Sequence, residues 1–166
     1  MKKVGIFYGS STGNMEAAAQ LLQQDLGEAD LFSVDDVQAS KVAEYDNVVL
    51  CSSTWGLGDM QDSMVGFVED LKKLNLSGKH FALMGMGDQS TYSSTYCDAI
   101  GQMYNELQDK GIEFIGRTDT DGYDFESSIS VVNDEFLGLA LDADNQDDLT
   151  ADRIKAWVSE LKKGFI

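Results

Sequence analysis

Residues 3–16, with the sequence KVGIFYGSSTGNME, decide the fold of this chain. Residues 4–7 form a short apolar run that is typical of a buried parallel strand. Gly9 ends this run, and residues 10–14 form a small loop rich in hydroxyl groups. Apolar residues then recur at helical spacing over residues 18–26. The stretch therefore predicts a strand, a polar loop and a helix in direct succession.

This arrangement can form a phosphate-binding site, because the first backbone N–H groups of a helix lack internal acceptors and the helix dipole favours an anion there. The loop has neither the Gly-Lys-Ser/Thr of an NTPase P-loop nor a G-x-G-x-x-G dinucleotide motif. It also has no Lys or Arg, so only N–H and O–H donors would hold the phosphate. An ordinary polar connection has the same composition, and this stretch alone does not distinguish the two.

The composition is that of a soluble globular protein. A length of 166 residues, with 43% hydrophobic and 25% charged residues, predicts one domain, residues 1–166, with a substantial core. Because there is neither an apolar run of 18 residues nor a signal-peptide pattern, we expect a cytoplasmic location. Cys51 and Cys97 lack the spacing of a metal site or a redox pair, and we expect Cys51 to be buried and no metal to be bound.

The charge balance is strongly acidic. Twelve basic residues stand against 29 acidic ones, which gives a net charge of −17. This charge argues against partners that are themselves anionic, namely nucleic acids and membranes with anionic lipids. It favours either a basic protein partner or simply a well-solvated surface.

Strand-like and helix-like segments alternate along the whole chain. Further strands are predicted at residues 30–34, 47–51, 79–86 and 113–115. The last of these is interrupted by a polar, acidic insertion at about residues 119–134 and resumes at residues 135–141. We expect Thr150 to cap the final helix. The alternation predicts an α/β fold, a doubly wound five-stranded parallel sheet between two layers of helices.

In such sheets ligands bind outside the carboxyl ends of the strands. Three loops leave those ends, which we call the first loop (residues 10–14), the second loop (53–62) and the third loop (87–96). The second loop carries Trp55 and the third carries Tyr92. Such aromatic residues often only anchor a loop, but here two of them flank one predicted site. A phosphate at one end and a flat ring between two aromatic side chains describe flavin mononucleotide, FMN.

Four stretches make the chain resemble a flavodoxin of the long-chain type along essentially its whole length. They are FYGSSTGN (7–14), STWGLGDMQD (53–62), GMGDQSTY (85–92) and a tail that contains DGYDFESS (121–128) and EFLGLALDADNQDDLTADRIKAW (135–157). Each stretch alone is only moderately specific for this family, whereas their order and spacing together are strong evidence for the resemblance. The interrupted fifth strand is similar to the insertion that distinguishes long-chain members.

The resemblance implies a set of FMN-binding residues. The first loop and the position after it would bind the phosphate, the second loop would contact the ribityl chain and one ring face, and the third would contact the ring edge and the other face. These residues are Ser10, Ser11, Thr12, Gly13, Asn14, Met15, Ser53, Thr54, Trp55, Gly56, Leu57, Gly58, Gly87, Asp88, Gln89 and Tyr92.

The chain departs from the family pattern at three positions. Met15 stands where the family usually has a hydroxyl residue, and the loss of that bond would cost about 1 kcal/mol of FMN binding. Asn14 stands where some relatives have Lys, and Thr91 where a Gly is common.

The resemblance further implies an electron-transfer protein, not an enzyme: a low-potential one-electron carrier in which FMN cycles between semiquinone and hydroquinone. In this family the peptide after the tryptophan, here Gly56–Leu57, turns over on one-electron reduction. Acidic residues such as Asp59 and Asp88 would disfavour the second electron. We expect a monomer whose partners are basic redox proteins, such as a ferredoxin/flavodoxin–NADP reductase or another oxidoreductase.

The sequence also bears on three other functions. A response-regulator receiver would need an acidic phosphoacceptor where Ser52-Ser53-Thr54 stand, so that interpretation fails. A hydrolase is disfavoured because His80, the only histidine, lies within a strand pattern. An FMN-dependent NAD(P)H:quinone-type reductase is the remaining alternative. It would need one open flavin face, which Trp55 and Tyr92 would both cover.

Overall fold

A central parallel sheet organises the computed structural model, which describes all 166 residues. The strand order is β2–β1–β3–β5, and the fifth position is shared by β6 and β10. Every pairing among these strands is parallel, as predicted. The strands are β1 (Val4–Gly9), β2 (Ala29–Ser33), β3 (Asn47–Trp55), β5 (His80–Met86), β6 (Glu113–Ile115) and β10 (Leu139–Leu141).

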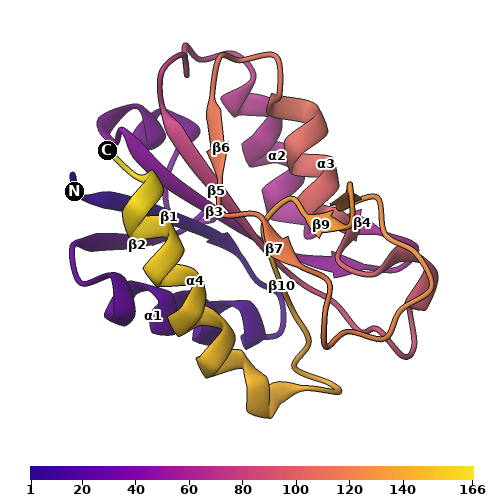
Figure 1. The fold of residues 1–166 in the computed structure, drawn as a ribbon. Helices are drawn as coiled ribbons and strands as arrows, with labels where there is room; N and C mark the ends of the chain where they lie inside the picture. The colour runs from indigo at the N-terminus through magenta and orange to yellow at the C-terminus, as the bar shows by residue number, and fades with distance from the viewer.

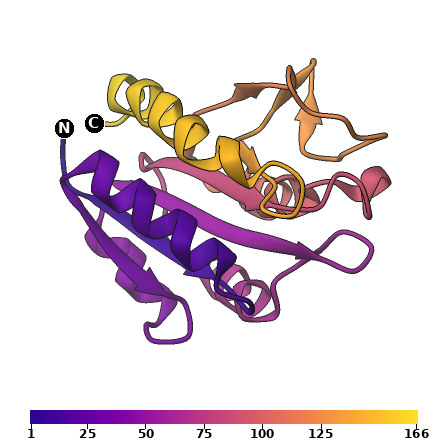
Figure 2. The same cartoon turned by 90° about the horizontal axis from the view of Figure 1, so that it is seen from below.

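Two pairs of helices cover the sheet, one pair on each face (Figure 1). On one face α1 (Asn14–Leu26) and α4 (Thr150–Gly164) pack side by side, which is plain from below (Figure 2). On the other face lie α2 (Asp62–Leu71) and α3 (Asp98–Leu107). The doubly wound, three-layer arrangement predicted from the alternation of segments is therefore confirmed.

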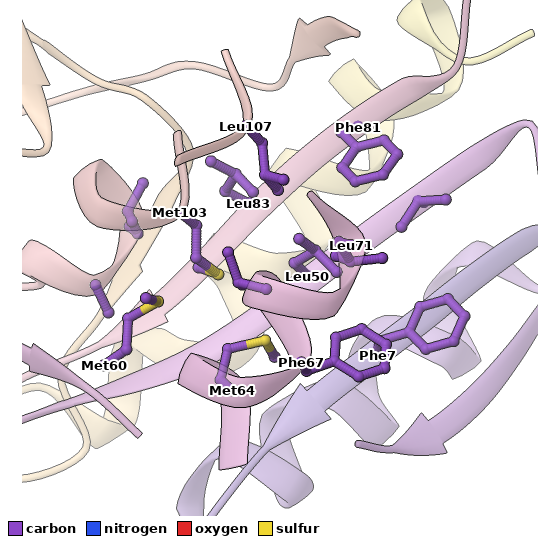
Figure 3. Close-up of a cluster of buried hydrophobic side chains, with 14 of the residues drawn as sticks. Phe7, Leu50, Met60, Met64, Phe67, Leu71, Phe81, Leu83, Met103 and Leu107 are labelled. Carbon is purple, nitrogen blue, oxygen red and sulfur yellow. The ribbon is translucent and has the colours of Figure 1, made fainter. Parts of the chain in front are cut away.

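Each face of the sheet has its own hydrophobic core, because successive strand residues point to opposite faces. Phe7 and Leu50 belong to the core beneath α2 and α3, which also holds Phe81 (Figure 3). Their neighbours Ile6 and Val49 belong to the core beneath α1 and α4. Burial on both faces explains why these strands are continuously apolar.

The fifth strand position is filled by two short strands with an insertion between them. β6 pairs with residues 80–82 of β5, and β10 pairs with residues 84–86 of the same strand. Between them, a small antiparallel sheet consists of β7 (Thr118–Asp119), β9 (Glu135–Phe136) and β8 (Val131–Val132). The predicted interruption is confirmed. The single strand predicted over residues 135–141 is wrong, because its first two residues belong to the small sheet.

Two further local predictions need correction. β3 continues to Trp55, beyond the predicted end at Cys51, because it pairs with β5 as far as Ser53 and then with β4 (Asp59–Met60). Thr150 does not cap α4: it is the first helical residue, and its buried hydroxyl has no hydrogen-bond partner. Helical φ and ψ at Thr150 turn its side chain away from the free N–H groups of the first turn.

The two chain ends and the only histidine lie together at the edge opposite the three loops. The backbone N–H of Lys2 donates to Ile166 O at 2.6 Å, and the side chain of Asn47 bonds to both end segments. His80 Nδ1 lies 2.9 Å from Gly164 O. His80 therefore has the structural role expected for it. Cys51 and Cys97 are both fully buried, and burial raises the pKa of each thiol.

Two possible features are absent from the described chain. None of its helices combines the length and the apolar character that crossing a membrane requires. No three His, Cys, Asp or Glu side chains are grouped so that they could hold a metal ion.

Gly138 lies where the chain enters β10, and we expect Gly138→Ala to destabilise the protein by about 1–3 kcal/mol or more. A Cβ at this position would overlap the backbone carbonyl of Leu83 in β5, which cannot move without breaking the sheet. Urea denaturation measures the effect. Gly66→Ala is the control, because Gly66 lies within α2 with open space around it and should gain up to about 1 kcal/mol. Equal stability of the two variants would contradict the expectation.

Candidate functional site

A cavity of about 250 Å³ lies at the carboxyl ends of the strands. The three loops meet there, as expected for ligand sites in doubly wound sheets. A segment that follows β10 also contributes to the lining. The lining residues are Thr12, Asn14, Ser53, Thr54, Trp55, Gly56, Met86, Gly87, Asp88, Tyr92 and Asp144.

One end of the cavity is the N-terminus of α1. Gly13 is the N-cap residue in a left-handed conformation, with φ 88°, and its N–H donates to Ser10 Oγ at 3.1 Å. The first N–H of the helix with an internal acceptor is that of Ala17, which donates to Gly13 O. The three N–H groups of residues 14–16 have no acceptor within the chain. This end therefore offers neutral hydrogen-bond donors to an anion.

Gln61 joins the first and second loops from behind. Its Nε2 donates to Ser11 Oγ at 3.2 Å, and its Oε1 accepts from Met64 N–H at 3.0 Å and so caps α2. Its own N–H donates to Ser53 O at 3.1 Å. Gly9 must lack a side chain, because a Cβ there would overlap Oε1 of Gln61. Gln61 is nearly fully buried and holds the two loops in register.

The second loop is a hairpin between β3 and β4. Thr54 pairs with Met60 and Trp55 with Asp59 in antiparallel register. Gly56 turns with φ 53° at its tip, a conformation that glycine adopts at little cost. Trp55 remains 41% exposed at the cavity. The hairpin thus presents a large aromatic side chain that is partly open to the cavity.

The third loop is held by the carboxylate of Asp88. One of its oxygens accepts from the N–H groups of Ser90 and Thr91, at 3.0 and 2.9 Å, and from the Asn145 amide at 2.8 Å. Burial disfavours ionisation of Asp88, but these hydrogen bonds outweigh it and lower the pKa of the carboxyl. The turn brings Tyr92 to the cavity, where the phenol ring is 42% exposed.

Behind the third loop lies the fully buried carboxylate of Asp142. It accepts from the backbone N–H and the side-chain amide of Gln89, at 3.0 and 2.8 Å. It also accepts from the N–H groups of Asp144 and Asn145, at 3.1 and 3.0 Å, and from the Asn145 amide. Asp142 therefore ties residues 142–146, which we call the fourth loop, to the third loop.

The cavity is anionic at the third and fourth loops. Asp88 and Asp144 both line it, and no Lys or Arg does. Burial raises the pKa of Asp144, and the nearby carboxylates of Asp88 and Asp142 raise it further. Any group that gains negative charge in the cavity would be repelled by these carboxylates.

The structure brings most of the predicted site residues to the cavity. Nine of them are among its lining residues: Thr12, Asn14, Ser53, Thr54, Trp55, Gly56, Gly87, Asp88 and Tyr92. The other seven do not line it: Ser10, Ser11, Gly13, Met15, Leu57, Gly58 and Gln89.

Two of these seven side chains are turned away from the cavity for clear reasons. The side chain of Met15 is fully buried in the core beneath α1, so only its backbone N–H can serve a ligand. Gln89 is also buried, and both its N–H and its amide are bonded to Asp142. Gln89 therefore has no free hydrogen-bond donor for the contact with a ring edge that we expect from the sequence.

Sequence reasoning missed Met86 and Asp144 in the lining, and Gln61 and Asp142 behind it. Residues 142–146 follow a predicted strand, so the rule about carboxyl ends could have found the fourth loop. Nothing in the sequence pattern distinguishes Gln61 from other polar residues of the second loop, because its role depends on contacts with a distant loop.

The family model described as Flavodoxin matches residues 6–157. A flavodoxin from Synechococcus elongatus is 39% identical over 168 residues, which cover 99% of each chain. One from Helicobacter pylori is 38% identical over 165 residues, also with 99% of each chain covered. The crystal structure of Fusobacterium nucleatum flavodoxin bound to flavin mononucleotide superposes with a TM-score of 0.95 and 30% identity, covering all of both chains.

Proposed function

Because the chain belongs to the flavodoxin family, we propose that it is an electron carrier that binds FMN in the cavity between the four loops. One observation carries the proposal: two half-exposed aromatic rings, Trp55 and Tyr92, line the same cavity whose far end is a row of free N–H donors. This combination suits a ligand with a flat ring at one end and a phosphate at the other. Bound FMN would supply one-electron redox chemistry.

The residues present fit the phosphate of FMN. The N–H groups of residues 14–16 have no other acceptor, and Thr12, which carries a hydroxyl, lines the same cavity. Gly13 keeps the start of the helix open, since no atom lies within 4 Å of where its Cβ would be. All these donors are neutral. The phosphate would therefore keep its negative charge, which adds to that of the surrounding carboxylates.

The aromatic residues support a carrier over a reductase. A reductase needs room over one flavin face for nicotinamide and then for its second substrate, whereas Trp55 and Tyr92 would occupy the space beside the ring. Electron transfer to another protein at an exposed edge of the flavin ring needs no binding site for a second substrate. The insertion within the fifth strand position supports the long-chain type as part of this proposal.

The carboxylates at the cavity should make the second one-electron couple strongly reducing. We expect Asp144→Asn to raise that potential by about 20 mV, because one unit charge within the same site contributes on the order of 0.5 kcal/mol in water-like surroundings. Spectroelectrochemistry measures the potential. Asp148→Asn removes the same charge at an exposed position outside the cavity lining and should shift it less. Equal shifts would show that only the net charge matters.

The proposed partners are basic redox proteins, such as a ferredoxin/flavodoxin–NADP reductase. The net charge of −17 supports this proposal, because opposite charges speed the encounter. We expect the second-order rate of electron transfer from such a reductase to fall by roughly tenfold or more between 10 and 300 mM salt. Stopped-flow absorbance with a reductase of known basic surface measures it. A rate that does not change with salt would contradict electrostatic steering.

FMN titration tests the proposed function directly. The purified chain is freed of flavin, and FMN is added while its fluorescence is followed. Stacking on Trp55 and Tyr92 should quench the emission with a sharp endpoint at one FMN per chain. Riboflavin, which lacks the phosphate, is the matched ligand and should bind far more weakly. A chain that leaves FMN fluorescence unchanged would refute the proposal.

A further inference from the structure

The side-chain amide of Gln102 bridges two backbone groups of the hairpin that carries Trp55. Gln102 lies half-buried on α3, away from the cavity lining. Its Nε2 donates to Gly58 O, and its Oε1 accepts from Met60 N–H at 3.2 Å. One amide thus satisfies a carbonyl and an N–H that stand two residues apart, which only a group with both a donor and an acceptor can do.

The same end of α3 holds the hairpin at two more points. The N–H of Ala99 donates to Thr54 Oγ1 at 3.2 Å. Gly58 packs so closely against Asp98 that a Cβ there would lie 2.8 Å from Asp98 Oδ2. Both sides of the hairpin are therefore fixed to α3. On the side of residues 58–60, the only hydrogen bonds from α3 are the two that Gln102 makes.

The tip of the hairpin is free by contrast. Gly56 and Leu57 take part in no hydrogen bond within the chain, and Leu57 is 86% exposed. Gly56 also lines the cavity. The peptide group between Gly56 and Leu57 can therefore turn without breaking an internal bond, whereas those at Gly58 and Met60 cannot.

We propose that Gln102 is a positioning residue for the redox site. It holds residues 58–60, so that any rearrangement of the hairpin that follows a change of charge in the cavity is confined to the peptides around Gly56 and Leu57. This inference rests on the proposed function. A hairpin that is already ordered outside its moving part loses less entropy when it rearranges, which favours the state that depends on the rearrangement.

Two substitutions separate this role from a structural one. Gln102→Met keeps the length of the side chain but removes both hydrogen bonds. Gln102→Glu keeps an acceptor for Met60 N–H but places a carboxylate against Gly58 O. Gln108→Met and Gln108→Glu are the matched controls, because Gln108 is exposed just beyond the end of α3 and its amide contacts only Asn105 O.

The readouts are the dissociation constant of oxidised FMN and both one-electron potentials, together with the melting temperature. Both Gln102 variants should make the potential of the first one-electron couple more negative. The expected shift corresponds to a loss of roughly threefold to tenfold in the affinity for one-electron-reduced FMN relative to oxidised FMN, where tenfold corresponds to about 59 mV. The Gln108 variants should match the wild type. A lower melting temperature with unchanged potentials would overturn the proposal and leave Gln102 a purely structural residue. Failure of the proposed function would appear separately, as a wild-type chain that binds no FMN.

Discussion

Trp55→Ala and Tyr92→Ala should each weaken FMN binding by roughly 5- to 150-fold, because stacking of a flat ring on an aromatic side chain contributes about 1–3 kcal/mol. Both rings line the cavity, and about two fifths of each residue is exposed, so each offers an open surface on which a flavin could stack. The measurement is the dissociation constant from fluorescence titration. Neither side chain belongs to the two hydrophobic cores, so the melting temperature of the flavin-free chain should change little.

The control for these substitutions is Leu57→Ala. Leu57 is the most exposed large apolar residue near the cavity but does not line it, so its removal should leave FMN affinity within about twofold of the wild type. Trp55→Phe and Tyr92→Phe keep an aromatic face and should recover most of the lost affinity. If neither alanine variant weakens binding, the flavin does not lie between these rings.

Asp142→Ala should destabilise the protein by about 2–4 kcal/mol. The substitution removes the acceptor of three backbone N–H groups, those of Gln89, Asp144 and Asn145. The N–H of Gln89 is buried, and a buried donor left without a partner costs about 1–3 kcal/mol, whereas the other two belong to exposed residues and lose less. This is a large part of the roughly 5–15 kcal/mol that stabilises a typical domain. The third and fourth loops would lose their connection, so FMN affinity should fall with stability. Thermal and urea denaturation measure the first effect.

Two variants define what is lost at this position. Asp142→Asn has the same shape and keeps one oxygen acceptor, so it should retain part of the stability. Asp147→Ala removes an exposed carboxylate from the same acidic segment and should change the free energy of unfolding by less than about 0.5 kcal/mol. An Asp142→Ala variant as stable as Asp147→Ala would mean that the buried network does not hold the two loops together.

The sheet and its helices were predictable because their signals are local. Residues 48–51 and 81–86 are short, continuous apolar runs of the kind typical of a buried parallel strand, and β3 and β5 contain them. The alternation with helical patterns then leaves few possible topologies. The loops that meet at the carboxyl ends follow from the same rule.

The remaining features depend on contacts that no local pattern records. β10 begins only at Leu139, because residues 135–136 pair with short strands of the insertion, and such two-residue pairings have no sequence period. Thr150 is the residue type that caps a helix, but the backbone there is already helical. Asp142 and Gln102 act through partners 42 to 53 residues away, and their residue types alone do not reveal these roles.

Stepwise anaerobic reduction of the FMN-loaded protein, followed by visible absorption, tests the electron-carrier proposal most directly. We expect two well-separated one-electron steps, the second at a strongly negative potential, with no turnover when NADH and a quinone are added. A single two-electron step accompanied by NADH-dependent quinone reduction would contradict it and identify a reductase.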